Sequence, residues 1–234
     1  MADLVTYQLR GGIATITLDD GKVNALSIAM LSQVGDALDR GVADDAVVVL
    51  TGRTGVLSAG FDLPVLRAGG EDALVLLRAG FTLAGRILSC RKPVVIACTG
   101  HAIAMGAFLV LSGDYRVGAA GPYRITANEV AIGLTLPRAA AVICRQRLTP
   151  AHFSRATVLA EVFDPAAARE AGFFDRVVAA PELALAASEA AGRLRSLDAA
   201  AHVATKLRVR GSMLADLRRA IDLDFASLDP SLRT

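Results

Sequence analysis

Cysteine is scarce in this sequence, and its placement excludes two kinds of stabilisation. The three cysteines, Cys90, Cys98 and Cys144, are odd in number and form no C-x-x-C pair. No histidine lies near them at a spacing typical of metal ligands. A disulfide framework and a metal site are therefore not expected, and the sequence predicts buried, reduced thiols.

Long hydrophobic runs are also missing, although the mean hydropathy is +0.47. The longest apolar stretch, over 93–110, is interrupted by two glycines, a threonine and a histidine. A membrane-spanning helix needs about 20 predominantly apolar residues, so none is predicted. The beginning of the chain has an acid at Asp3 and a polar run over 6–8, which is not a signal-peptide pattern. We expect a cytoplasmic protein.

Neither sign of charge dominates the chain, since 25 Lys and Arg residues and 23 Asp and Glu residues leave a net charge of +2. This balance argues against a nucleic-acid partner. The sequence also contains no Walker A motif and no G-x-G-x-x-G turn, so nucleotide hydrolysis and dinucleotide chemistry lack support. A basic cluster near the end is typical of a solvated helix face, or alternatively helps to hold a phosphorylated ligand. It consists of Lys206, Arg208, Arg210, Arg218 and Arg219.

What the chain has in abundance is aliphatic side chains. Hydrophobic residues make up 53% and aromatic residues only 5%, which suits a tightly packed core or a large subunit interface. A length of 234 residues allows one large domain or a domain with an appendage. From residue 181 onward the sequence is Ala-rich and predicts only helix. We place the boundary between a core over 1–195 and a helical region over 196–234.

Alternating strand and helix patterns predict an α/β fold with parallel pairing. Residues 4–10 and 13–18 flank Gly11-Gly12 and predict a β-hairpin. Ser27 fits the N-cap of a following helix, which has apolar residues at helical spacing up to Leu38. Further strands are predicted over 46–50, 93–98, 115–118 and 173–178, and further helices over 70–89, from about 107 to 111 and over 165–171.

Two turns of small residues follow predicted strands. In one, over 100–106, the small side chains leave the first N–H groups of the next helix open to a ligand oxygen, aided by the helix dipole. The other consists of Ser58, Ala59, Gly60, Phe61 and Asp62. Such turns commonly serve chain geometry alone, but two N–H donors from them would form an oxyanion hole.

Glu129 is the one acid between Asp114 and Glu161, and apolar residues follow it. Burial would raise its pKa toward neutrality, the condition for exchanging a proton with a weakly acidic carbon. The alternative is a surface or hydrogen-bonded structural Glu.

From Val5 to Val178 the chain resembles the crotonase superfamily, also called the enoyl-CoA hydratase/isomerase family. The order and spacing of the matching segments make a specific signature, which favours Glu129 as a catalytic base. They are Lys22-Val-Asn-Ala-Leu26, the bend over 58–62, Lys92-Pro-Val-Val with the turn after it, Gly113-Asp114-Tyr-Arg, and Asn128-Glu129 followed by Ile132-Gly133.

The resemblance implies a repeated ββα spiral core, with a C-terminal helical region over 196–234 that assembles a trimer or a hexamer. It also implies a coenzyme A thioester substrate and no cofactor beyond the coenzyme A within that substrate. The family's two oxyanion-hole donors fall on the backbone N–H groups of Phe61 and Met105. Asp62 fits turn stabilisation better than catalysis. The implied substrate-binding residues are Lys22, Asn24, Ala25, Leu26, Ala59, Gly60, Asp62, Gly106, Phe108 and Asn128.

One departure from the family pattern bears on the reaction. The family's hydratases carry a first catalytic Glu on the helix after the second donor, where this chain has Phe108. An apolar residue there, with Asn128-Glu129 at the second position, resembles the family's 3-enoyl-CoA isomerases. Phe108 would exclude water and raise the pKa of Glu129. The sequence thus predicts an enoyl-CoA isomerase with a single Glu base. The alternatives are an enoyl-CoA hydratase of fatty-acid β-oxidation and an acyl-CoA-binding protein without turnover.

Overall fold

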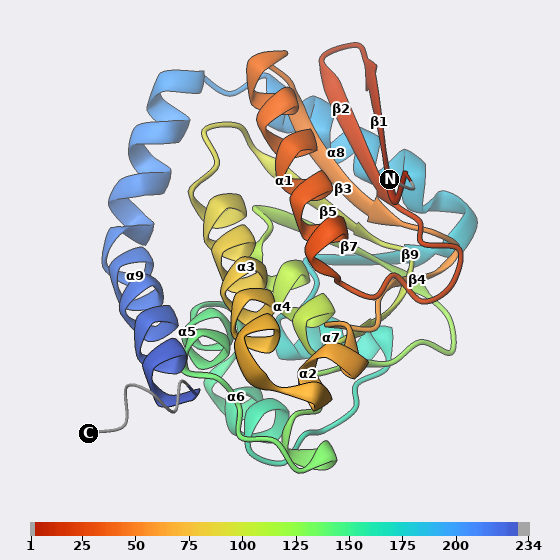
Figure 1. The fold of residues 1–234 in the computed structure, drawn as a ribbon. Coiled ribbons are helices and arrows are strands. Elements are labelled where there is room, and N and C mark those ends of the chain that lie inside the picture. Colours follow the sequence, from red (N-terminus) through yellow and green to blue (C-terminus); the bar gives the residue numbers. More distant parts are fainter. Residues whose placement is uncertain (1–2, 229–234) are drawn as a thin grey trace.

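The computed structural model describes residues 3–228, and its first elements follow the sequence pattern (Figure 1). Strands β1 (Val5–Arg10) and β2 (Ile13–Leu18) form the predicted antiparallel hairpin around Gly11-Gly12. Both glycines have positive φ, the backbone conformation that such a turn requires. Helix α1 (Ile28–Ala43) begins at Ser27, whose hydroxyl accepts a hydrogen bond from the Met30 N–H, 3.2 Å away. The predicted N-cap is confirmed.

A six-stranded sheet forms the centre of the fold. Its pairings after the hairpin are all parallel. Parallel sheets are covered on both faces, which explains why the β3 sequence VVVLTG is almost wholly apolar and buried. The strand order is β1, β2, β3 (Val47–Gly52), β5 (Val94–Cys98), β7 (Tyr115–Ala120) and β9 (Arg176–Ala179).

Helices cover the two faces of this sheet. Val47 and Val49 of β3 pack toward α8 (Leu183–Arg195). Val48 and Leu50, which point the other way, join the main core beneath α1 and α3 (Gly70–Ser89). Figure 1 shows α1 and α3 in front of the sheet and α8 behind it.

A second, three-stranded sheet has the order β4 (Gly55–Ser58), β6 (Gly100–Ile103) and β8 (Ile125–Thr126), with parallel pairing. The sequence predicts a small-residue turn where β6 lies, and that prediction is wrong; it predicts no strand at β4 or β8. The strands are short and contain glycine for a steric reason. A Cβ on Gly100 would lie 2.0 Å from the Gly55 carbonyl oxygen, so only glycine allows this pairing.

The chain therefore repeats a ββα unit, one strand in the larger sheet and the next in the smaller one, which confirms the predicted fold class. The helices α5 and α6 are not predicted from the sequence. The remaining helical segments are α2 (Leu63–Ala68), α4 (Met105–Ser112), η1 (Val130–Ile132), α5 (Arg138–Arg147), α6 (Pro150–Thr157), α7 (Pro165–Ala171) and η2 (Ala180–Glu182).

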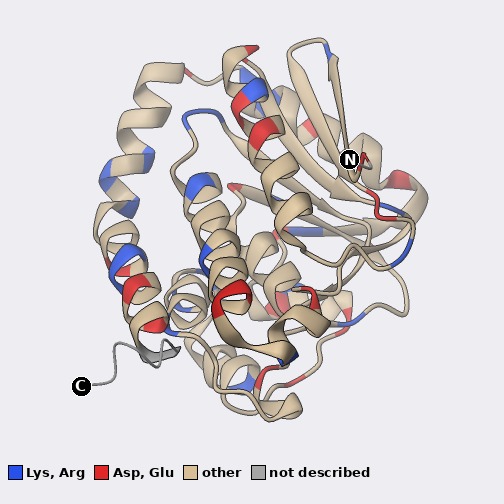
Figure 2. Cartoon of the chain, in the orientation of Figure 1, with Lys and Arg blue, Asp and Glu red and all other residues tan. Residues whose placement is uncertain are grey.

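The C-terminal helix α9 (Ala199–Leu228) folds back on its own chain and packs against α3 and α5. Leu214 and Leu217 on its inner face are buried in the main core. Lys and Arg residues recur along α9, with acids toward its C-terminal end (Figure 2). Within residues 3–228, no helix is long and apolar enough to cross a membrane.

Two members of the basic cluster on α9 do not form a solvated helix face. The Lys206 Nζ lies 2.7 Å from the Asp114 carboxylate, and the Arg210 Nη1 lies 2.9 Å from it. All three side chains are at most 10% exposed. The two cations thus fasten α9 to the start of β7.

Candidate active site

Three segments that leave the smaller sheet form the candidate site. Phe61 follows β4 by three residues, Met105 follows β6 by two, and Glu129 follows β8 by three. Because these strands are parallel neighbours, their carboxyl ends lie at one edge of the sheet. That edge is where open α/β sheets commonly bind ligands.

The turn that carries Phe61 is held by a backbone bridge to Leu26. The Leu26 N–H donates to the Gly60 carbonyl at 2.8 Å, and the Asp62 N–H donates to the Leu26 carbonyl at 3.3 Å. In a parallel bridge of this kind the middle residue turns its own N–H the other way. Phe61 is that residue, and its N–H donates no hydrogen bond within residues 3–228.

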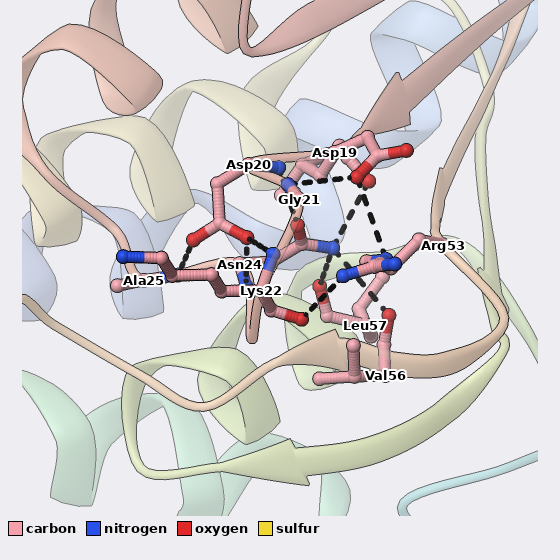
Figure 3. A network of polar contacts seen from close by, with 10 residues as sticks. Asp19, Asp20, Gly21, Lys22, Asn24, Ala25, Arg53, Val56 and Leu57 are labelled. Carbon is pink, nitrogen blue, oxygen red and sulfur yellow. Dashed lines mark hydrogen bonds and ion pairs between the residues drawn. The ribbon is translucent and has the colours of Figure 1, made fainter.

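The segment over 19–25 supports Leu26 through a dense polar network (Figure 3). The Asp20 carboxylate accepts hydrogen bonds from the N–H groups of Lys22, Asn24 and Ala25 at 2.7–2.9 Å. These hydrogen bonds stabilise its charged form and lower its pKa against the opposing effect of desolvation. The Asn24 side chain donates to the carbonyls of Leu18 and Leu57.

This network assigns a structural role to residues expected in a nucleotide pocket. Asn24 and Leu26 are fully buried, and Asn24 uses its side-chain amide inside the protein. Neither side chain is available to a ligand, and contact of their backbone groups with a nucleotide stays a prediction. Lys22 is exposed, and its contact with a nucleotide stays a prediction.

Met105 is the first residue of α4, so its N–H has no partner in the helix. It donates no other hydrogen bond within the described chain. Ala104, just before it, has φ of 50° and ψ of −121°, a conformation that costs about 1–3 kcal/mol in a residue with a side chain. Such strain at a turn marks it as a functional candidate. The Ala104 N–H donates to the Thr126 carbonyl at 2.8 Å, which ties this turn to the segment carrying Glu129.

Gly106 permits the close packing of the two turns. A Cβ on Gly106 would lie 2.4 Å from the Ser58 carbonyl oxygen. Any other residue there would push α4 away from the turn that carries Phe61.

Glu129 is a buried carboxylate at the beginning of η1, with 8% of its surface exposed. Its Oε2 atom has no hydrogen-bond partner within the described chain, and neither has the Oδ1 atom of Asn128. Desolvation raises the pKa of Glu129 to about 7, against a smaller opposing effect from its own backbone N–H. The raised pKa predicted from the sequence is confirmed, and the carboxylate can exchange a proton near neutral pH.

A cavity of about 460 Å³, here called the site cavity, joins these segments. Phe61, Ala104, Asn128 and Glu129 line one part of it. Among the described residues that line it, Glu129 alone has an ionisable side chain. Helices α2 and α3 supply an apolar wall made of Leu63, Leu66, Ala73, Leu74, Leu77 and Phe81.

The expected site residues outside the 22–26 segment differ in their position relative to the site cavity. Ala59, Phe61, Asn128 and Glu129 line the site cavity. Three residues, Met105, Gly106 and Phe108, are buried and do not line the cavity, while Gly60 and Asp62 lie in the turn beside it.

Phe108 lies one layer deeper than expected from the sequence. It is 1% exposed and stacks on Phe81, with ring centroids 6.1 Å apart. Phe81 forms the cavity surface at that point.

Three structural features of the candidate site are not predicted from the sequence. Asp20 organises the supporting loop, and its position before Gly21 was an available turn signal. The strained Ala104 has no sequence signal because alanine is common in turns and helices alike. The apolar wall of α2 and α3 depends on tertiary packing.

Comparisons with known proteins agree with this architecture. The model of the enoyl-CoA hydratase/isomerase family matches residues 8–228. The structure of a Mycobacterium tuberculosis enoyl-CoA isomerase superposes with a TM-score of 0.93 at 48% identity, covering 97% of this chain and 99% of that one. The structure of the enoyl-CoA hydratase EchA3 from Mycobacterium ulcerans has a TM-score of 0.93 at 46% identity, covering 97% and 100%.

A more distant relative is the human mitochondrial enoyl-CoA delta isomerase 1. It is 27% identical over 232 residues, which cover 94% of this chain and 75% of the human protein. The family match spans nearly the whole described chain, and the fold matches at TM-scores above 0.9. This chain is a crotonase-fold enzyme that belongs to the enoyl-CoA hydratase/isomerase family.

Proposed function

We propose that the protein shifts a double bond in an enoyl-CoA thioester, with Glu129 as the single proton-transferring base. The observation that carries this proposal is the isolation of Glu129. It is the one ionisable side chain lining the site cavity within the described chain, and burial raises its pKa to about 7. Double-bond migration needs one such group, because the base that removes a proton can also return it.

The proposed reaction starts from a 3-enoyl-CoA thioester. The Glu129 carboxylate takes a proton from C2, and the electron pair of that C–H bond moves into a dienolate whose negative charge rests on the thioester oxygen. The N–H groups of Phe61 and Met105 hold this oxygen, aided by the N-terminal end of α4. Glu129 then returns the proton at C4, which leaves the double bond between C2 and C3.

Hydration is the second candidate, because the M. ulcerans relative is named a hydratase. Addition of water to a 2-enoyl-CoA requires a water molecule held opposite the enolate carbon, and the apolar stack of Phe81 and Phe108 provides no polar group for it. The third candidate is acyl-CoA binding without turnover. The unpaired carboxylate of Glu129 favours turnover over binding alone, since an unpaired buried acid costs stability.

The setting and the assembly of the enzyme are proposals of their own. We propose fatty-acid metabolism as its setting, coenzyme A as part of the substrate with no separate cofactor, and a homotrimer or hexamer as its assembly. A cytoplasmic location remains a prediction.

The test is an assay of the purified protein with matched 3-enoyl-CoA and 2-enoyl-CoA substrates, together with a measurement of acyl-CoA binding. We expect faster conversion of the 3-enoyl substrate. Faster hydration would favour the second candidate, and binding without turnover of either substrate would favour the third.

A further inference from the structure

A small compartment lies beside the site cavity and is not lined by Glu129. It has a volume of about 120 Å³, and five residues line both spaces. They are Leu74, Leu77, Phe81, Thr135 and Pro137. The shared wall shows that this space, here called the tail compartment, adjoins the site cavity.

Helix α9 closes the far end of the tail compartment with Ile221, Asp224 and Phe225. This part of α9 is held by contacts to two other helices, α5 and α3. The Asp224 carboxylate accepts hydrogen bonds at 3.0 Å from the N–H groups of Arg138 and Ala139. It thereby caps the first turn of α5, whose own N-cap residue, Pro137, has no side chain able to do so.

The second fastening joins α9 to α3. The Arg78 guanidinium lies 4.2 Å from the centre of the Phe225 ring and 3.4 Å from the Asp222 carboxylate. A cation over an aromatic face is attractive, so the ring is held in place at the end of the compartment. The charged side chains of Arg78, Arg138 and Asp224 also line this end of the compartment.

We infer that the tail compartment receives the end of the substrate's acyl chain and that Ile221 and Phe225 set the longest chain the enzyme accepts. This inference rests on the proposed function. An apolar tail that starts at Glu129 runs along Leu74 and Leu77 and then meets the Phe225 ring. A longer tail has to displace α9 or place methylene groups against charged side chains, and both are unfavourable.

The experiment measures kcat/KM for 3-enoyl-CoA thioesters of increasing chain length. The wild type should show a steep decrease beyond one length. Phe225→Ala should move that cut-off to longer chains and raise kcat/KM for the first rejected length about tenfold or more. Ile221→Phe should move the cut-off to shorter chains and leave the shortest substrate unaffected.

Two control variants distinguish an effect of the compartment's volume on the cut-off from an effect of loosening helix α9. Leu223→Ala removes an exposed side chain from the same turn of α9 and should not change the profile. Asp222→Asn weakens the ion pair to Arg78 without changing the compartment wall, and it should also leave the cut-off in place. A cut-off that moves equally in Asp222→Asn would overturn the inference, because helix loosening would then explain it.

A second readout distinguishes this inference from the proposed function. The Kd values of saturated acyl-CoA thioesters of graded length require no turnover. If no enoyl-CoA is converted but the Kd cut-off moves with Phe225→Ala and Ile221→Phe, the proposed function is wrong and the compartment assignment stands. If both folded variants keep the wild-type cut-off in kcat/KM and in Kd, the assignment is wrong.

Discussion

The backbone of Gly60 lies against the amide of Met105: a Cβ added at Gly60 would sit 3.6 Å from the Met105 nitrogen and 3.0 Å from the Ile103 carbonyl oxygen. The two turns that carry the proposed oxyanion-hole donors are therefore in contact. Their separation depends on the missing side chain of Gly60, whose φ is +94°.

Gly60→Ala should accordingly reduce kcat by about 10²–10³-fold, the loss typical of one displaced oxyanion-hole donor. Gly55→Ala is the matched control, because Gly55 lies in the same segment with φ of +85° but has open space where its Cβ would be. Both variants should lose stability from backbone strain. Steady-state kinetics and thermal unfolding of the two proteins check this, and equal activities would show that the contact with the Met105 turn is unimportant.

Phe108→Glu should raise hydration relative to isomerisation, because it restores an acid at the position where the family's hydratases carry one. The side chain is buried behind Phe81, so the variant should also lose stability. The measurement is the ratio of the two rates with matched substrates, alongside thermal unfolding. Phe108→Gln has a similar shape without the acid and should not raise the ratio; an unchanged ratio in the Glu variant would place this position outside the reaction.

The sequence predicts the order of the main elements well where local signals agree. Ser27 and Asp164 each accept a hydrogen bond from a backbone N–H as helix N-caps, and Gly172 ends α7 in the left-handed conformation. Glu129 is correctly predicted as buried with a raised pKa, but the apolar residues after it do not explain the burial, since Val130 and Ile132 are about half exposed.

The rest depends on tertiary contacts that local signals do not contain. Gly55 and Gly100 look like turn residues, but they are glycine because two strands meet there. Asn24 looks like a ligand contact, yet its amide satisfies carbonyls from two other strands. The closure of the tail compartment by Phe225 joins residues far apart in sequence, which no local pattern indicates.

A trimer or a dimer of trimers is expected in solution, with α9 contributing to the interface. Val209 on α9 is 73% exposed, so its side chain is accessible to a neighbouring subunit. Val209→Asp should dissociate the assembly, whereas Leu185→Asp on α8, 64% exposed, should not. Light scattering checks both, and a wild-type mass of 24.3 kDa at micromolar concentration would contradict the expectation.

The raised pKa of Glu129 predicts a stability cost that depends on pH. Folding favours the protonated carboxyl group, so stability is complete below the ordinary pKa of 4.5 and decreases as pH rises to about 7. Glu129→Gln removes the ionisation and should unfold at a higher temperature than the wild type above neutral pH, with a smaller difference in acid. Thermal unfolding across this pH range checks the sign; an equal difference at all pH values would show that Glu129 is not held protonated.

Exchange of the C2 hydrogen tests directly whether Glu129 alone moves the proton. The measurement follows deuterium uptake at C2 of a bound enoyl-CoA in wild type and in Glu129→Gln, with the Kd of a saturated acyl-CoA as the binding control. Loss of a general base should slow exchange by about 10²–10⁴-fold, while the Kd stays close to the wild-type value because the amides of Phe61 and Met105 are unchanged. Wild-type exchange should itself decrease as pH falls through about 7. Exchange at the wild-type rate in the Gln variant would contradict the account, and Asp62 would be the next acid to test.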